Sequence, residues 1–133
     1  MFKFDKYLKE AKRYIEKGDA VQAGEKLYRC GKEAIKLLAE TFDIEENKKA
    51  KEMGRWYTPL LGNAAIRLSK IVDSRIFAFW KTVYYLHCEG FHERHLDVEN
   101  VRENLKDIEE LVEIAKKYKN ERGINEGRDE FDS

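Results

Sequence analysis

Several residue types are scarce in this chain of 133 residues, and each scarcity excludes a class of protein. Proline occurs once, and two cysteines are too few for the disulfide framework of a small secreted fold. No stretch approaches the roughly 18 consecutive apolar residues of a membrane span. The first residues, MFKFDKYLKE, contain no apolar core of a signal peptide. We therefore expect a cytoplasmic protein that does not enter a membrane.

An excess of charge of either sign is also lacking, since 26 Lys and Arg residues face 26 Asp and Glu residues. A formal net charge of zero creates no global field that would draw the chain to nucleic acid, an anionic membrane or an acidic partner. Charge-driven binding must therefore come from a local patch. Abundant Lys and Glu with a single glutamine is a composition often found in heat-adapted proteins.

Apolar residues recur every three or four positions in five segments, and this spacing predicts amphipathic helices. The expected helices cover about 3–17, 20–41, 58–72, 75–88 and 98–119, and Gly18 marks the end of the first. The helix over 20–41 is apolar on more than one face, so we expect it to be central. No segment alternates between apolar and polar residues as a strand does. The fold class is therefore all-α, a five-helix up-and-down bundle over residues 1–119. The mostly polar segment 43–57 leaves a short surface helix open, and the acidic tail 120–133 is expected to be disordered.

Helix boundaries are marked by capping and helix-breaking residues. Asp19, with Gln22 three residues later, forms a capping-box pattern and makes the first two helices a hairpin. Thr58, followed by the only proline, is a second helix start. Gly90 is expected to end the helix over 75–88, and Asp97 is expected to cap the last helix. The helix over 75–88 is aromatic on all sides, so we expect it to be buried or covered by a partner subunit in a homodimer.

All three histidines lie within ten residues, in LHCEGFHERH at 86–95. A zinc site would need three or four ligands, but Gly90 divides the group and no HExxH pattern is present. An imidazole beside a carboxylate can act as a general base, but no nucleophile signature accompanies it. The alternative is a helix end, where His87 interacts with the helix dipole, followed by a polar connector. We assign no metal, cofactor or catalytic residue, and the weak catalytic candidates are His87, His92, Glu93 and His95.

The second concentration of versatile side chains is Arg55-Trp56-Tyr57, directly after a glycine. An Arg with two aromatic rings can hold a phosphate and stack a base. Alternatively, Trp56 packs a loop onto the core, and nearby glutamates cancel the neighbouring lysines. The ligand-binding candidates are Arg55, Trp56, Tyr57, Glu89 and His92, and the open question is whether folding brings His92 and Glu93 beside Arg55 and Trp56.

Three motifs in this order, EKGDAVQAGEKLYRCGKEAIKLLAE, GRW and LHCEGFHE, resemble the archaeal PaREP family. The resemblance spans about residues 5–115. The family is similar in turn to the HEPN (higher eukaryotes and prokaryotes nucleotide-binding) helical domains, which implies an HEPN-like bundle and a dimer. HEPN ribonucleases carry an Arg four to six residues before a His. This spacing is absent here, because Arg94 directly precedes His95 and Arg75 lies too far ahead of His87.

These observations favour a non-enzymatic binding or assembly module. Its expected partner is a nucleotide, a nucleic acid or a nucleotidyltransferase, in addition to a second copy of the chain. The alternative is a divergent HEPN-type ribonuclease that lacks the usual spacing of Arg and His.

Overall fold

The computed structural model describes residues 2–92 and 94–132, and the side chains of these except residues 91, 92 and 123–132. The described chain is entirely helical, which confirms the predicted class. Its elements are α1 (Lys3–Glu16), α2 (Ala20–Thr41), α3 (Glu45–Met53), α4 (Thr58–Ile71), α5 (Ile76–Tyr85), the π-helical segment η1 (Leu86–His92) and α6 (Val98–Asp132). None of the described helices is both long and apolar enough to cross a membrane.

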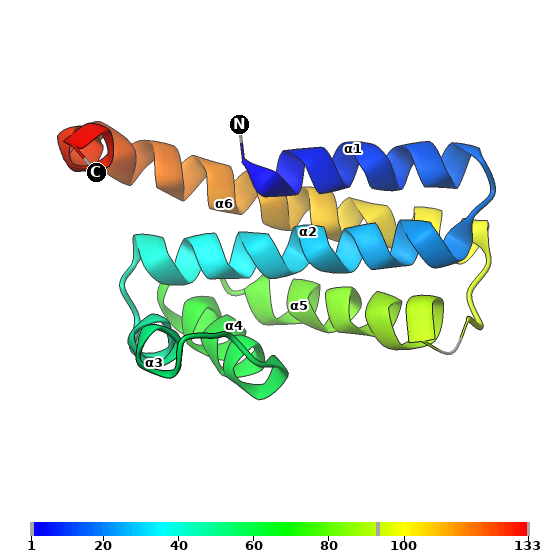
Figure 1. Ribbon diagram of the computed structural model, residues 1–133, viewed down its shortest axis with the longest axis horizontal. Coiled ribbons are helices and arrows are strands. Elements are labelled where there is room, and N and C mark those ends of the chain that lie inside the picture. Colours follow the sequence, from blue (N-terminus) through cyan, green and yellow to red (C-terminus); the bar gives the residue numbers. More distant parts are fainter. Residues whose placement is uncertain (1, 93, 133) are drawn as a thin grey trace.

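The helices α1, α2 and α6 and the continuous pair α5 and η1 lie side by side in roughly the same direction, with α2 at the centre (Figure 1). The helix α2 packs against α1 on one side, α6 behind and α5 with η1 below, while α3 and α4 lie together near its C-terminal end. Its fully buried positions include Ala23, Leu27, Ala34, Ile35 and Leu38. The sequence therefore predicted the central position of this helix correctly.

The hairpin of α1 and α2 is determined by local signals. Gly18 adopts φ +77°, a left-handed conformation that glycine accepts without strain. The Asp19 carboxylate then accepts a hydrogen bond from the Gln22 backbone N–H at 3.0 Å, which confirms the predicted cap. The Asp19 backbone N–H donates to the Tyr14 carbonyl at 2.9 Å, and this bond replaces the second half of the predicted capping box.

The predicted count of five helices is wrong, because the described residues form six α-helices and η1. The additional helix α3 has no apolar stripe, so its sequence pattern is weak. It is held by a charged contact instead: the Arg67 guanidinium donates to both carboxylate oxygens of Glu46, at 2.7 and 3.3 Å. Burial opposes ionisation of Glu46, but this pairing lowers its pKa overall, so the carboxylate that ties α3 to α4 stays charged.

Gly90 does not end a helix, contrary to the sequence-based expectation. The chain leaves α5 at Tyr85 and continues as η1 through Gly90 to His92. The glycine serves a close approach between helices. A Cβ atom added to Gly24 of α2 would lie 3.2 Å from the Leu86 carbonyl oxygen and 3.6 Å from the Gly90 Cα. Two facing glycines therefore let the backbones of α2 and η1 approach each other.

The remaining predicted helix starts have mixed outcomes. Asp97 accepts a hydrogen bond from the Asn100 backbone N–H at 2.9 Å, and the Asn100 side chain accepts from Asp97 N–H at 3.3 Å, which confirms the cap of α6. Pro59 lies at the start of α4 as predicted, but Tyr57 occupies the cap position and no side chain caps the helix. Thr58 hydrogen bonds to Tyr28 of α2 instead.

The backbone of α6 passes the predicted boundary at residue 119 without interruption and remains helical to Asp132. Side chains beyond Arg122 lie outside the described residues. The expected disorder of the tail 120–133 therefore stays a prediction.

Candidate functional site

The cluster at 86–95 is divided between two environments. His87 points into the contact between η1 and α2, where 19% of its side chain is exposed. His95 lies beyond η1 with 66% of its side chain exposed, and its Nδ1 is 2.9 Å from Glu89 Oε2. The side chain of His92 and the whole of Glu93 fall outside the described residues. The three histidines thus do not form one described group.

His87 belongs to a continuous set of rings that we call the aromatic cluster: Tyr28, Trp80, Tyr84 and His87. The imidazole stacks on the Tyr28 ring, with centroids 3.8 Å apart and an interplanar angle of 21°. Trp80 lies 6.4 Å from both the Tyr28 and Tyr84 ring centroids. Tyr84 lies 6.2 Å from His87 and closes the set. The cluster joins α2 to α5 and η1.

The cluster has a buried base and one exposed member. Trp80 and Tyr28 are 4% and 9% exposed, whereas Tyr84 is 41% exposed. Tyr84 is therefore a ring supported by aromatic neighbours and open to solvent on the other side. The adjacent Tyr85 is 43% exposed, but no described ring contact joins it to the cluster.

Neighbouring side chains shift the pKa values of the two tyrosines of the cluster. The hydrogen bond between Tyr84 and Cys88 raises the pKa of Tyr84. Burial raises the pKa of Tyr28, and the hydrogen bond with Thr58 partly offsets this effect. Both phenols therefore stay neutral at neutral pH and present polar edges without a charge.

Charged side chains of α2 border the cluster. Lys32 Nζ lies 5.3 Å from the centroid of the Tyr28 ring, and burial, followed by the nearby Lys36, lowers the pKa of Lys32. On the other side, Glu25 Oε2 lies 3.8 Å from His87 Nδ1, while Glu25 Oε1 accepts from Arg29 Nε at 2.9 Å. The rings thus lie between a cation and a carboxylate that is paired with a second cation.

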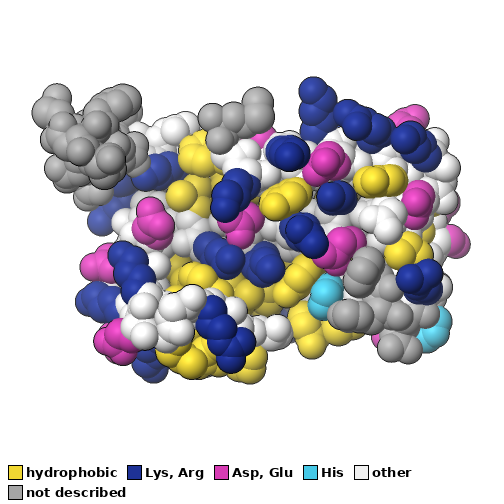
Figure 2. Space-filling view, in the orientation of Figure 1, with side chains coloured by type: hydrophobic (Ala, Val, Ile, Leu, Met, Phe, Trp, Pro, Cys, Tyr) yellow, Lys and Arg dark blue, Asp and Glu magenta, His cyan; other side chains and the backbone are white. Residues whose placement is uncertain are grey.

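The space-filling view places this site on one face of the molecule. Hydrophobic side chains gather along the lower edge of α2, with Lys and Arg side chains above and below them (Figure 2). An arrangement of apolar surface between cations suits a flat ring system that carries negative charge. This face therefore carries a local patch of apolar and basic side chains, although the chain as a whole has no net charge.

The candidates of the second motif lie at the edge of this face. Trp56 is half-buried and packs against the core, as the structural alternative predicted. Arg55 is exposed, with its guanidinium carbon 5.7 Å from the centroid of the Tyr57 ring. The hydrogen bond between Tyr28 and Thr58 brings the end of this motif to the aromatic cluster.

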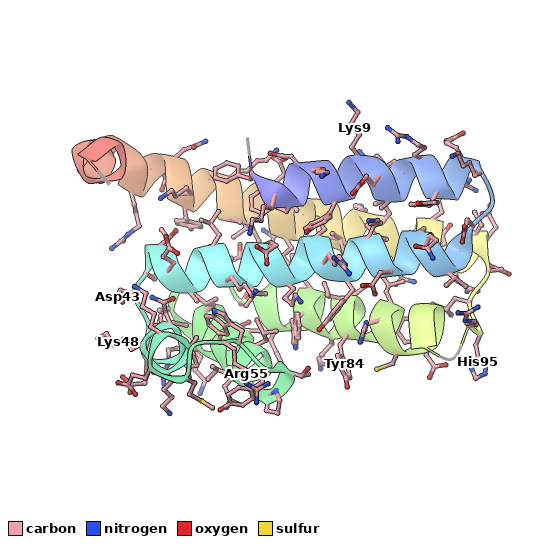
Figure 3. The ribbon with its side chains drawn as sticks, viewed as in Figure 1. Lys9, Asp43, Lys48, Arg55, Tyr84 and His95 are labelled. Carbon is pink, nitrogen blue, oxygen red and sulfur yellow. The ribbon has the colours of Figure 1, made fainter. Side chains whose placement is uncertain are left out.

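Among the described residues of the two predicted motifs, Arg55 and His95 do not come together. Arg55 and His95 lie far apart along the molecule, with Tyr84 between them (Figure 3). Glu89 pairs with His95 and stays with the exposed connector. The predicted meeting of His92 and Glu93 with Arg55 and Trp56 lies outside the described residues. Within those residues, His87 is the histidine connected to the second motif, through Tyr28 and Thr58.

No group of three or more His, Cys, Asp and Glu side chains in the described part of the chain is arranged to hold a metal ion. The chemistry of the site is therefore described by its rings, hydroxyls and flanking charges.

Sequence analysis missed five residues of this site, including Trp80 of α5. Glu25, Tyr28 and Lys32 are spaced three and four positions apart on α2, so they share one face with a polar, an aromatic and a basic side chain. That spacing could have singled out this face of a helix whose other faces carry most of its apolar residues. Tyr84 offered no such signal, because five aromatic residues lie in the same helix.

Similar proteins agree with this architecture. A crystal structure of a protein from Sulfolobus solfataricus matches with a TM-score of 0.84 and 35% identity, over 89% of this chain and 97% of that one. A solution structure of the same structural-genomics target matches with a TM-score of 0.77 and 36% identity, over 86% of this chain and 89% of that one. No curated protein matches the chain. The model of the archaeal PaREP1/PaREP8 family matches residues 3–112, so the chain belongs to this family.

Proposed function

We propose that the protein is a non-enzymatic binding module that takes the base of a nucleotide or nucleic acid on the exposed ring of Tyr84. The observation that carries the proposal is the support of this ring by Trp80 and His87, at centroid distances of 6.4 and 6.2 Å. A ring held by aromatic neighbours loses little conformational entropy when a base stacks on it. Stacking of a base on such a ring contributes about 1–3 kcal/mol.

The flanking charges support the same class of ligand. Lys32 borders the cluster on α2, and Arg55 lies three residues before Thr58, whose side chain interacts with Tyr28. Both side chains can interact with phosphate, Lys32 as a point charge and Arg55 through its planar guanidinium. The hydroxyl of Tyr84 and the imidazole of His87 supply polar groups for the edge of a base.

The test is binding of a fluorescein-labelled single-stranded oligonucleotide, followed by fluorescence anisotropy. We expect Tyr84→Ala to raise the Kd about 5- to 100-fold, which corresponds to the loss of one stacked base. Tyr85→Ala is the matched control, since Tyr85 is equally exposed on the same helix but lies apart from the cluster. Equal effects of the two substitutions, or no binding by the wild-type chain, would refute the proposal.

Ribonuclease activity is the second candidate function, and the contact between His87 and Glu25 favours it. Glu25 Oε2 lies 3.8 Å from His87 Nδ1, beyond hydrogen-bond distance, and a carboxylate on this side can orient the imidazole of a general base. A fluorescein-labelled single-stranded RNA, incubated with the protein and analysed on a denaturing gel, distinguishes the two functions. Cleavage by the wild-type chain that is lost in His87→Ala would support the ribonuclease. RNA that the wild-type chain binds but leaves intact supports the binding module.

We further propose that the module acts in the cytoplasm as a homodimer of the HEPN-like type. Its two cysteines are free thiols, which suits a reducing compartment. Exposed apolar side chains on α4, Ile66 at 38% and Ile71 at 56%, supply surface for a second copy. Multi-angle light scattering of the purified chain gives its molar mass and tests the dimer.

A further inference from the structure

The groove between α4 and α5 has an unusual charge composition. It encloses about 350 Å³ and has an apolar floor that includes Ile66, Phe77 and Ala78. Lys70 and Lys81 flank this floor, two serines complete the lining, and no lining residue is acidic. The Lys81 ammonium lies 4.9 Å from the centroid of the Phe77 ring. The groove is therefore apolar at its base and positive at its rims.

Two other grooves on the described surface show the contrast, since each contains its own carboxylates. In the groove between α3 and α4, of about 240 Å³, Arg67 is paired with Glu46. In the groove beside α6, of about 370 Å³, Arg75 is paired with both Asp73 and Glu110. Neither Lys70 nor Lys81 forms an ion pair with a described carboxylate. An acidic partner with an apolar anchor would fit this groove, because its carboxylates can pair with the two lysines and its apolar side chain can contact the floor.

The sequence of the chain contains a segment of this composition at its C-terminal end. Phe131 is preceded by Asp129 and Glu130 and followed by Asp132. This segment lies beyond residues 3–112, which the family model matches. The backbone of α6 also extends beyond the ends of the other helices (Figure 1).

We propose that the C-terminal segment 129–132 of one copy binds in the groove between α4 and α5 of a second copy. Phe131 contacts the apolar floor, and the flanking carboxylates pair with Lys70 and Lys81. A reciprocal exchange of the two segments gives a closed dimer with two-fold symmetry. The inference rests on the proposed homodimer and specifies the contact that holds it, and it is independent of base binding by Tyr84.

The test exchanges the charges of groove and segment in two full-length variants. The groove variant carries Lys70→Glu and Lys81→Glu, and the segment variant carries Asp129→Lys, Glu130→Lys and Asp132→Lys. Each variant alone opposes like charges, so we expect its dimerisation constant to weaken about tenfold or more. An equimolar mixture of the two restores opposite charges at both contacts. We expect light scattering to show that the mixture regains the mass of the wild-type dimer.

Two further variants separate this contact from general effects of charge and folding. Lys48→Glu with Lys51→Glu changes two exposed lysines of α3 and should leave the dimer intact. Phe131→Ala should weaken it without any change in charge, and circular dichroism checks that every variant remains helical. If the charge-exchanged variants dimerise like the wild type, or their mixture stays monomeric while the wild type dimerises, the inference is wrong and the proposed dimer stands. A monomeric wild-type chain would exclude both.

Discussion

His87 and His95 lie eight residues apart in the sequence, yet they occupy opposite environments. His87 is stacked on Tyr28 at 3.8 Å in the packed contact between η1 and α2. His95 is two-thirds exposed and is held by Glu89 in the connector to α6. The described polar residues of 86–95 therefore do not form one site. What distinguishes the two histidines is the presence or absence of a face of α2 opposite them.

The closest approach on the packed side gives the largest expected effect. A Cβ atom at Gly31 of α2 would lie 2.3 Å from Val83 Cγ2 on α5. Gly31→Ala should therefore lower the free energy of unfolding by about 1–3 kcal/mol, the usual result of overpacking, despite the better helix propensity of alanine. Urea unfolding followed by circular dichroism measures the change.

Gly62 of α4 is the matched control for this substitution. The same added atom would meet only Trp80 Nε1, at an ordinary 3.7 Å. Gly62→Ala should stabilise the protein by about 0.5–1 kcal/mol, because glycine inside a helix costs conformational entropy in folding. A stable Gly31→Ala variant would show that α5 can move away from α2, and would contradict the close packing described here.

Alkaline pH should weaken the packing of α2 against α1 through a second residue of α2. Cys30 is fully buried and its thiol donates to the Phe4 carbonyl at 3.4 Å. Burial, with the nearby Asp5, raises the pKa of Cys30 to about 12. The unfolded chain loses this proton near pH 8.5. The native state binds the proton more tightly, so its contribution is fully present below about pH 8.5 and is lost as the pH rises toward 12.

Unfolding by urea at several pH values measures this loss, which reaches about 1.4 kcal/mol per pH unit for one proton. Cys30→Ala lowers stability at neutral pH but should flatten the decline above about pH 8.5. An unchanged decline in this variant would assign the alkaline instability to other groups.

Much of the fold follows from local signals in the sequence. The cap at Asp19, the left-handed Gly18 and the cap at Asp97 each act within a few residues, so the pattern alone identified them. The central position of α2 followed from its apolar residues on several faces. The short helix α3 escaped the count because its stability depends on Arg67, which lies 21 residues beyond Glu46.

The errors at the candidate site have the same origin. A glycine at position 90 is typical of a helix end. Its place inside η1 is explained by the facing Gly24, 66 positions earlier, where the two backbones approach closely. Tyr28 and Tyr84 belong to one cluster because Trp80 and His87 lie near both rings, and no spacing within either helix encodes these contacts. Sequence therefore singled out the segment that becomes η1 but not the residues of α2 that pack against it.

The smallest expected effect tests the two histidines directly. His87→Ala removes a ring from the aromatic cluster and should lower the free energy of unfolding by about 0.5–1.5 kcal/mol beyond the loss of buried area. His95→Ala removes an exposed ion pair with Glu89, worth about 0–0.5 kcal/mol, while the backbone hydrogen bond from His95 N–H to the Glu89 carbonyl remains. Urea unfolding of both variants at one pH measures the difference. Equal losses would contradict the comparison, because the packed environment of His87 would then contribute no more to stability than the exposed environment of His95.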